Sequence, residues 1–364
     1  MENQLIKAAN NLIRQGRFAD AIEILERLED EEPENPEIKF NIAIANMEMW
    51  NIKEAIKNFE RINTLNEDFS EHLPYMARAF MATNDFIKGI YFGKLYLDKN
   101  FSEESSEIKN TISDLAICYF KVWEHEKAKN NLKKLIEMWE SYPEIYELLW
   151  KCYFKINKNE KSLFHLNKAI YLGSEKAELW NMKAAIYAQN KNYKDAIFAI
   201  SKAITKNTNN VWLYYNKAYY EFLDNDLTTA LKTARYAEKL EPSFPHIYIV
   251  KALLFIKQKK VSQAEKEIES AIKLDKNIPQ IYVIQAQINI EKNELEKAKK
   301  NIDTAKKLWE DELIILKLTW KYFEAKNKPK NATINYEKAL DIAIERWLKA
   351  EAVDISMIIK KLIS

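Results

Sequence analysis

The chain has 364 residues, of which 47% are hydrophobic and 30% are charged, so it can bury a sizeable core and its composition gives no case for disorder. With only 4 Gly and 8 Pro, it favours long helices joined by short turns over an all-β fold. The formal net charge of +2 excludes a globally basic surface of the kind that binds nucleic acid or acidic lipid.

The N-terminal residues Met-Glu-Asn-Gln-Leu have neither the basic nor the apolar region of a signal peptide. No uninterrupted apolar run approaches the ~20 residues of a membrane span. Two Cys are too few for a disulfide framework. We therefore expect a cytoplasmic, reducing location without membrane insertion.

Charge is distributed unevenly along the chain. Residues 1–72 carry 8 Lys and Arg against 16 Asp and Glu, a net charge of −8, so the remainder carries +10. Solvated helix faces account for such a pattern in most proteins. The alternative is an acidic end that steers a basic partner, or that meets the basic end of another copy.

Small residues recur at a fixed spacing from one end of the chain to the other. The spacing is 34 residues, and each small residue is followed seven positions later by another small or apolar one, as in Ala196/Ala203, Ala230/Ala237 and Ala264/Ala271. An aromatic or apolar residue, such as Trp180 or Tyr214, stands sixteen positions before each of them. Apolar residues between these landmarks follow helical spacing, so each unit predicts two helices separated by a polar turn.

Ten units of this kind follow one another in a single register. Their bounds are 2–35, 36–69, 70–108, 109–142, 143–176, 177–210, 211–244, 245–278, 279–312 and 313–346. Most of the prolines fall at the start of a unit, at its end or in its turn, where they do not interrupt a helix. Pro74 is the exception, and it falls in the first turn of a helix, which tolerates it.

At this point the sequence resembles the tetratricopeptide repeat family, whose 34-residue unit has a large apolar residue at position 4, small residues at positions 8, 20 and 27, and Tyr at position 11. Unit 177–210 matches with Trp180, Ala184, Tyr187, Ala196 and Ala203. The resemblance implies an all-α fold, a right-handed α-solenoid superhelix of about ten helical hairpins. Lysines replace the family's Leu at position 7 in three units, at Lys183, Lys217 and Lys251, and are interpreted as tolerated variants.

Unit 70–108 is irregular. It holds Gly89 and Gly93 inside its second helix, where each Gly costs about 1 kcal/mol relative to Ala, and a five-residue insertion near 99–106. The chain is therefore divided into repeats 1–3 (2–108) and repeats 4–10 (109–346). A longer surface loop is the favoured interpretation of the insertion, and a hinge is the alternative.

Residues 347–364 follow the last repeat and predict an amphipathic helix. Its apolar side carries Leu348, Ile355, Ile358, Ile359 and Leu362. Because a solenoid needs its last hydrophobic face covered, we expect a C-terminal capping helix. A segment that docks on a partner is the alternative.

Motifs for catalysis or cofactor binding are missing from the sequence. The four His form no i, i+4 pair and no cluster with Cys or carboxylates at zinc-ligand spacing. The Gly residues are isolated, so there is no phosphate-binding loop, and the repeats use every residue from 2 to 346. Cys118 and Cys152 stand one hairpin apart, on the order of 10 Å, too far for a disulfide. We expect no enzyme activity, no cofactor and no metal site.

The resemblance implies that positions 2, 5, 9 and 12 of each first helix line a concave groove that binds partners. In repeats 2 and 7–9 these positions are mainly aromatic or aliphatic, which predicts an apolar binding site. Packing on neighbouring helices is the competing interpretation. The predicted groove residues are Trp212, Tyr215, Tyr219, Phe222, Ile249, Leu253, Ile256, Val283, Ile290, Phe40, Ile44 and Met47.

The leading hypothesis is therefore a non-catalytic scaffold that binds a peptide or helix of another protein in its groove. One alternative is a ligand- or peptide-responsive regulator. Another is a structural subunit that forms homo-oligomers through its unlike-charged ends. Nucleic acid is not expected as a partner, because the net charge is near zero.

Overall fold

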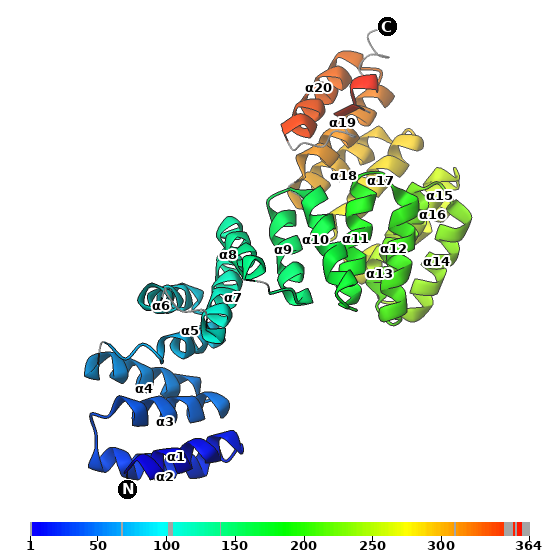
Figure 1. The fold of residues 1–364 in the computed structure, drawn as a ribbon. Helices are drawn as coiled ribbons and strands as arrows, with labels where there is room; N and C mark the ends of the chain where they lie inside the picture. The colour runs from blue at the N-terminus through cyan, green and yellow to red at the C-terminus, as the bar shows by residue number, and fades with distance from the viewer. Residues whose placement is uncertain are drawn as a thin grey trace. The chain divides into compact units, whose positions relative to one another are not determined.

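The computed structural model describes residues 2–66, 68–100, 105–138, 140–308, 311–345, 352–353 and 355–358. Within these ranges every regular element is a helix, and the helices form ten antiparallel pairs (Figure 1). None of these helices is long and apolar enough to cross a bilayer. The all-α, repeated hairpin fold predicted from the sequence is confirmed.

The chain divides into two compact units, Met1–Ser174 and Glu175–Ser364, each with five helix pairs. The first helices of the pairs in the first unit are α1 (Glu2–Arg14), α3 (Pro36–Glu48), α5 (Leu73–Ala82), α7 (Ser106–Lys121) and α9 (Pro143–Lys155). Their partners are α2 (Phe18–Glu31), α4 (Ile52–Leu65), α6 (Phe86–Lys99), α8 (His125–Glu137) and α10 (Asn159–Tyr171).

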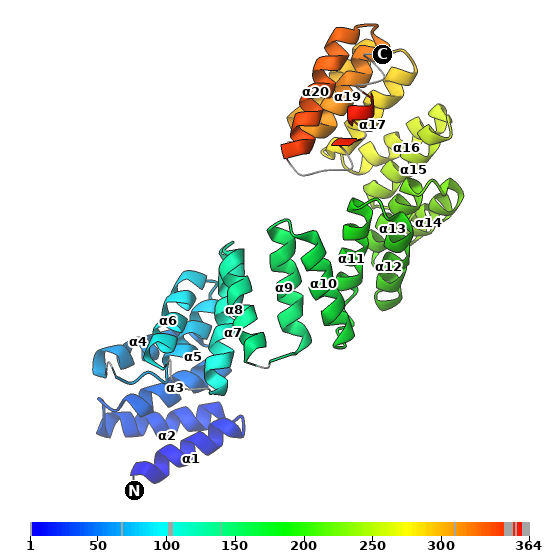
Figure 2. The ribbon, with the colours of Figure 1, turned by 45° about the horizontal axis from the view of Figure 1, so that its top comes forward.

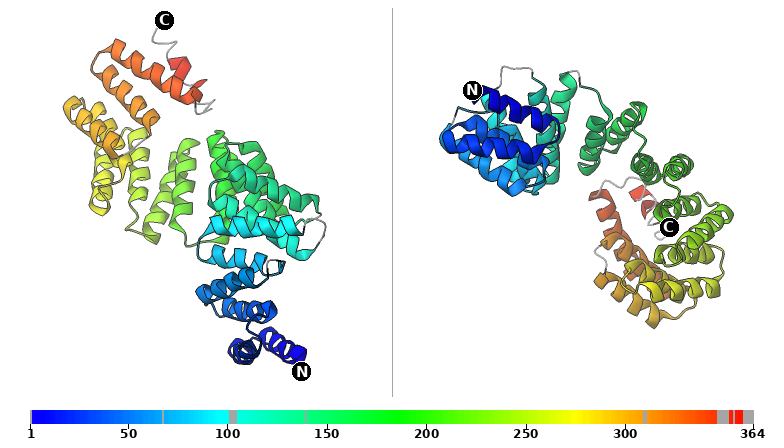
Figure 3. Two further views of the ribbon diagram at one scale, coloured as in Figure 1. Left: turned by 90° about the vertical axis from the view of Figure 1, so that its left-hand side faces the viewer. Right: turned by 90° about the horizontal axis from the view of Figure 1, so that it is seen from below.

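The second unit repeats this arrangement. Its first helices are α11 (Ala177–Gln189), α13 (Val211–Leu223), α15 (Pro245–Lys257), α17 (Pro279–Glu291) and α19 (Glu312–Ala325). Their partners are α12 (Tyr193–Lys206), α14 (Leu227–Leu240), α16 (Val261–Leu274), α18 (Leu295–Leu308) and α20 (Pro329–Glu345). Consecutive pairs lie side by side within the unit (Figure 2). Among its first helices, α13 contacts α15, α15 contacts α17, and α17 contacts α19. The two views of Figure 3 show the same succession of pairs from other sides.

Most first helices begin at the first residue of a predicted unit. Prolines occupy the first position of α3, α9, α15 and α17, where the fixed φ of proline suits a helix start. Three helices depart from the prediction: α5 begins three residues late, α19 begins one residue early, and α7 begins at Ser106 and not at residue 109. The hydroxyl of Ser105 accepts the backbone N–H of Ile108 at 3.3 Å and caps the helix. The predicted boundary at 108 therefore falls inside α7, and the boundary between the two units follows Ser174.

The turn inside each pair has the same hydrogen-bonded geometry throughout. At repeat position 15 the backbone adopts a positive φ, and the next N–H donates to the carbonyl of position 11, as Asn51 does to Asn46 at 2.8 Å. This is the Schellman arrangement, in which a left-handed residue ends a helix. Position 15 is Gly16 in the first pair and Asn in five others, but it is Trp50 in the second pair and Trp123 in the fourth.

Replacing Trp50 with asparagine is expected to stabilise the protein by about 0.5–1 kcal/mol, because a left-handed conformation costs an ordinary L-residue roughly 1–2 kcal/mol and Asn less. The Trp50 side chain is 82% exposed, so little burial is lost. Thermal unfolding of the variant measures the gain. Trp50→Ala is the matched control, since it removes the ring and keeps a strained residue. Equal melting temperatures for both variants would contradict the explanation.

The glycines of the third pair are sites of close helix packing. A Cβ placed on Gly89 would lie 3.1 Å from Sγ of Cys118 and 3.4 Å from the carbonyl oxygen of Ala77. A Cβ on Gly93 would lie 3.0 Å from Cδ2 of Leu115. Both glycines thus let α6 approach α5 and α7, and their local effect is to tighten this part of the first unit.

The predicted C-terminal helix is described only in part. Ile355 is buried in a cluster with Leu316 and Trp320 of α19 and Tyr336 of α20, and Ile358 packs against the same cluster. Leu348, Ile359 and Leu362 lie outside the described residues. The role of the whole segment 347–364 as a cap stays a prediction.

Candidate functional site

The first helices of the second unit carry a row of aromatic side chains on α13. Trp212 and Tyr215 lie within one helical turn of each other, and the Tyr215 ring stacks on that of Tyr219 at 6.4 Å between centroids. Phe222 continues the row, stacked on Tyr219 at 6.2 Å. Because these residues are three or four positions apart, they share one face of the helix. We call these four residues the aromatic row.

The start of the next first helix, α15, extends this surface at its Trp212 end. Phe244 and His246 stack on each other at 5.0 Å, and both contact the Trp212 ring, at 4.7 and 4.9 Å. Such edge-to-face and tilted contacts stabilise aromatic clusters beyond simple burial. Trp212 remains 49% exposed, while Phe244 is buried beneath it. The half-exposed indole of Trp212 is therefore supported by the rings of Phe244 and His246, which we call its aromatic base.

The aromatic row and its base are uncharged at neutral pH. Burial, together with the neighbouring Tyr219, raises the pKa of Tyr215 to about 12. Burial also lowers the pKa of His246, which therefore stays neutral. A surface of this kind favours apolar and aromatic groups of a partner over charged ones.

The other predicted groove residues are less accessible than the sequence suggested. Ile249 and Val283 are buried, at 4% and 9% exposure, because neighbouring first helices pack over them. Those two side chains offer a partner little surface. The remaining residues of repeats 7–9 are partly buried against the core. They are Tyr215, Tyr219, Phe222, Leu253, Ile256 and Ile290.

The predicted groove residues of repeat 2 also pack inside the first unit. Phe40 contacts the rings of Phe69 and Tyr75 at 5.9 and 5.4 Å. Ile44 and Met47 are partly buried against the same core cluster. In repeat 2 the predicted groove residues therefore serve mainly to pack neighbouring helices together.

A charged network on the first unit escaped the sequence prediction. The Arg78 guanidinium donates to Asp114 at 2.7 Å and to Glu107 at 2.5 Å, and it lies 5.3 Å from the centre of the Tyr75 ring. It joins α5 to α7. Arg78 stands at groove-side position 9 of repeat 3, but Asp114 stands at position 6 of repeat 4, so the repeat positions alone did not pair them. Because Asp114 and Glu107 already neutralise the charge of Arg78, we assign Arg78 a structural role in holding α5 against α7.

No group of three or more His, Cys, Asp or Glu in the described part of the chain could hold a metal ion. Cys118 and Cys152 are both buried free thiols, and burial raises the pKa of each to about 12. A thiol with so high a pKa is a poor nucleophile at neutral pH. The two cysteines are packing residues.

A partly buried histidine, His165, makes the stability of the first unit dependent on pH. Burial, followed by the nearby Lys133 and Lys161, lowers the pKa of His165 to about 4, and its ring stacks on Tyr153 at 4.9 Å. The unfolded chain therefore binds a proton near pH 6.5 that the folded chain refuses until about pH 4. We expect stability to fall as the pH drops through this window.

Replacing His165 with phenylalanine should flatten this pH dependence while keeping the ring stack. The test compares melting temperatures of the two proteins at intervals from pH 7 to pH 4. Carboxylates titrate in both proteins, so the difference between the curves isolates His165. Curves that stay parallel over the whole range would rule out the contribution of His165.

Two family models match parts of the chain. One is described as tetratricopeptide repeat and matches residues 12–79, and the other is described as anaphase-promoting complex, cyclosome, subunit 3 and matches residues 189–271. No curated protein sequence matches the chain.

Solved structures show the same fold. A tetratricopeptide repeat protein from Parabacteroides merdae is 19% identical with a TM-score of 0.57, and the match covers 70% of this chain and 99% of that one. The C-terminal part of a repeat protein of the same type from Cytophaga hutchinsonii is 18% identical with a TM-score of 0.55, covering 65% and 95%. At these identities the likeness concerns the arrangement of helices.

Proposed function

We propose that the chain is a non-catalytic scaffold that binds a segment of another protein along the first helices of its second unit. A tetratricopeptide repeat model matches residues 12–79, and the fold is that of solved tetratricopeptide repeat proteins. The observation that carries the proposal is the aromatic row with its exposed Trp212. Exposed Trp and Tyr on a rigid base are the residues that most often dominate the binding energy of protein interfaces.

The chemistry of the surface indicates the kind of segment that fits. It is neutral and apolar, and the half-buried Leu253 and Ile256 of the next repeat extend it. An amphipathic helix could lay its apolar face here, and an extended apolar segment could do the same. The two buried thiols suit a reducing compartment such as the cytoplasm.

A photo-crosslinking amino acid at position 243, an exposed residue next to Phe244, can identify the bound segment in cells and keeps Trp212 in place. The synthetic segment is then titrated against purified protein by fluorescence anisotropy. Trp212→Ala is expected to weaken binding at least tenfold, since loss of a central aromatic anchor costs about 2 kcal/mol or more.

Phe198→Ala is the matched control, because Phe198 is a 59% exposed aromatic residue of the same unit on the second helix α12. Its removal should leave the dissociation constant unchanged. Binding that survives Trp212→Ala, or that both variants weaken equally, would refute the proposed surface. Circular dichroism spectra of both variants establish that the helices are intact.

A further inference from the structure

A tyrosine is held in the same way in three successive repeats. Tyr214, Tyr248 and Tyr282 all stand at position 4 of their repeats. Each hydroxyl donates to the backbone carbonyl six residues earlier, at 3.0, 2.9 and 2.9 Å. Those carbonyls belong to the turn that precedes each first helix, so every ring is fixed at both ends.

In repeat 8 an ion bridge lies beside this tyrosine. Lys251 lies one helical turn after Tyr248, and its Nζ is 5.1 Å from the centre of that ring. The same Nζ is 2.8 Å from Glu238 of α14 and 2.8 Å from Glu267 of α16. The bridge therefore spans the furrow between α14 and α16, with α15 as its floor.

The corresponding furrow in repeat 4, between α6 and α8 over α7, has none of these groups. Ile112 stands at the position of the tyrosine, and the Glu-Lys-Glu bridge is replaced by Leu97, Leu115 and Asn131 at the matching repeat positions. A cavity of about 550 Å³ lies here, and all four of these residues line it. We call it the α7 cavity.

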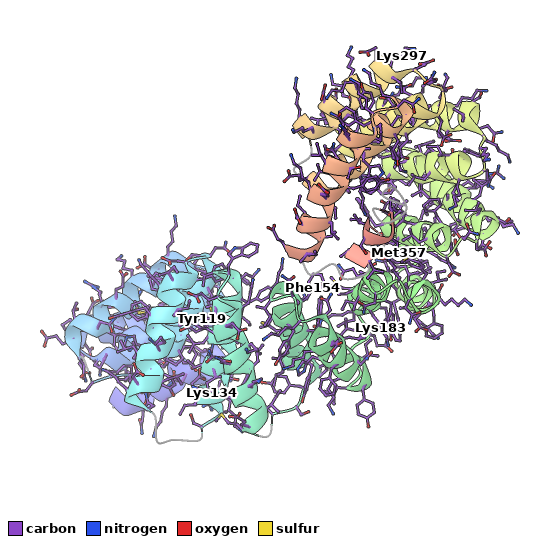
Figure 4. All side chains as sticks on the ribbon, turned by 90° about the horizontal axis from the view of Figure 1, so that it is seen from above. Tyr119, Lys134, Phe154, Lys183, Lys297 and Met357 are labelled. Atoms are coloured by element: carbon purple, nitrogen blue, oxygen red, sulfur yellow. The ribbon has the colours of Figure 1, made fainter. Side chains whose placement is uncertain are left out.

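The α7 cavity has an apolar floor and a polar rim. Ile112 and Leu115 are buried side chains of α7 that form the floor. Tyr119 and Lys134, both labelled in Figure 4, lie at its α7 and α8 sides. The rim also carries Lys94, Asp98 and Glu137, so charges of both signs surround the opening. A cavity of this size falls within the range of about 300–1,000 Å³ typical of ligand sites.

We propose that the α7 cavity receives the aromatic side chain, Tyr or Phe, of a partner polypeptide. In repeat 8 the chain places its own Tyr248 at the equivalent position, partly buried against the core cluster and beside the bridging Lys251. An aromatic anchor in an apolar pocket, with polar groups at the rim to pair with the flanking residues, is the arrangement of a protein interface. The site lies wholly within the first unit and is independent of the aromatic row.

Met138 lines the cavity and gives a direct readout. The full-length protein is labelled at the methionine methyl groups with carbon-13, and the Met138 signal is assigned by its loss in Met138→Leu. The probe is N-acetyl-tyrosinamide, with N-acetyl-leucinamide as the aliphatic control. We expect the tyrosine probe to shift the Met138 signal in a saturable way and the leucine probe to leave it in place. The signal of Met357, in the second unit, is the internal reference.

Filling the cavity should abolish the response. Ile112→Tyr places in repeat 4 the residue that repeat 8 carries, and Ile112→Phe is a second filling variant for use if the first does not fold. Neither folded variant should show a Met138 shift with the tyrosine probe. Trp212→Ala should show the full shift, which separates this site from the proposed binding surface of the second unit.

Four results would overturn the proposal. They are an unmoved Met138 signal in the wild type, an equal shift with the leucine probe, an unchanged shift in a folded filling variant, and a shift with free p-cresol but not with N-acetyl-tyrosinamide. The last would make the cavity a small-molecule site. The comparison of probes in the wild type stands even if both filling variants unfold.

Discussion

Replacing Lys251 with alanine is expected to lower the free energy of unfolding by about 3 kcal/mol, the low end of the range for breaking a buried ion pair. Lys251 is 6% exposed, and its ammonium group is held by Glu238 and Glu267 from two different helices. Its removal leaves two carboxylates facing each other across the furrow without a counter-charge. Urea denaturation followed by circular dichroism measures the loss.

The charge state of Lys251 makes its contribution to stability depend on pH. Burial opposes the charge, but the hydrogen bonds and charges of the two glutamates outweigh it, so the pKa of Lys251 is raised above its ordinary 10.5. The folded protein therefore holds the proton more tightly than the unfolded chain does. The stabilising contribution is complete below about pH 10.5 and is lost as the pH rises through the folded-state pKa.

Two controls separate charge from packing. Lys257→Ala removes an exposed lysine from the same helix and should change stability by less than about 0.5 kcal/mol. The triple variant Lys251→Met, Glu238→Gln, Glu267→Gln removes all three charges and should recover much of the loss. A triple variant as unstable as Lys251→Ala would show that the cost lies in packing and not in the uncompensated carboxylates.

The helices and their register could be predicted because the signals are local. Small residues at a 34-residue spacing and prolines at helix starts require no knowledge of neighbours. The positive φ at position 15 is also local, but it escaped prediction where the residue is Trp50 or Trp123, since large aromatic residues rarely adopt it. There the hydrogen bonds of the turn impose the conformation.

The contacts between helices could not be read from single positions. Lys251 was interpreted as a tolerated replacement for Leu, because its two partners lie 13 residues before and 16 residues after it, on other helices. Ile249 and Trp212 were assigned to the same groove, yet Ile249 is buried at 4% exposure and Trp212 is 49% exposed. They stand at positions 5 and 2 of their repeats, both assigned to the groove, so that assignment does not by itself fix exposure. The exposure of a groove-side residue depends on whether the next first helix packs over it.

Gly93 shows how the repeat pattern can mislead. In the nine other repeats position 24 is an apolar core residue, such as Phe59 or Leu132, and substitutions toward a family consensus usually stabilise proteins. Replacing Gly93 with phenylalanine should nevertheless destabilise the protein by roughly 2 kcal/mol, the middle of the range for overpacking a core. The reason is that Leu115 of α7 already fills this space, 3.0 Å from where a Cβ would stand.

The gain in helix propensity on replacing Gly, about 1 kcal/mol at most, is smaller than the strain of moving α6 away from α7. Ile87→Phe is the control, because it adds the same ring to a 66% exposed position of the same helix and should change stability little. Thermal unfolding compares the two variants. A melting temperature for Gly93→Phe at or above that of the wild type would mean that α6 and α7 can separate at no cost, and the glycine pair would then belong to the hinge that the sequence left as an alternative.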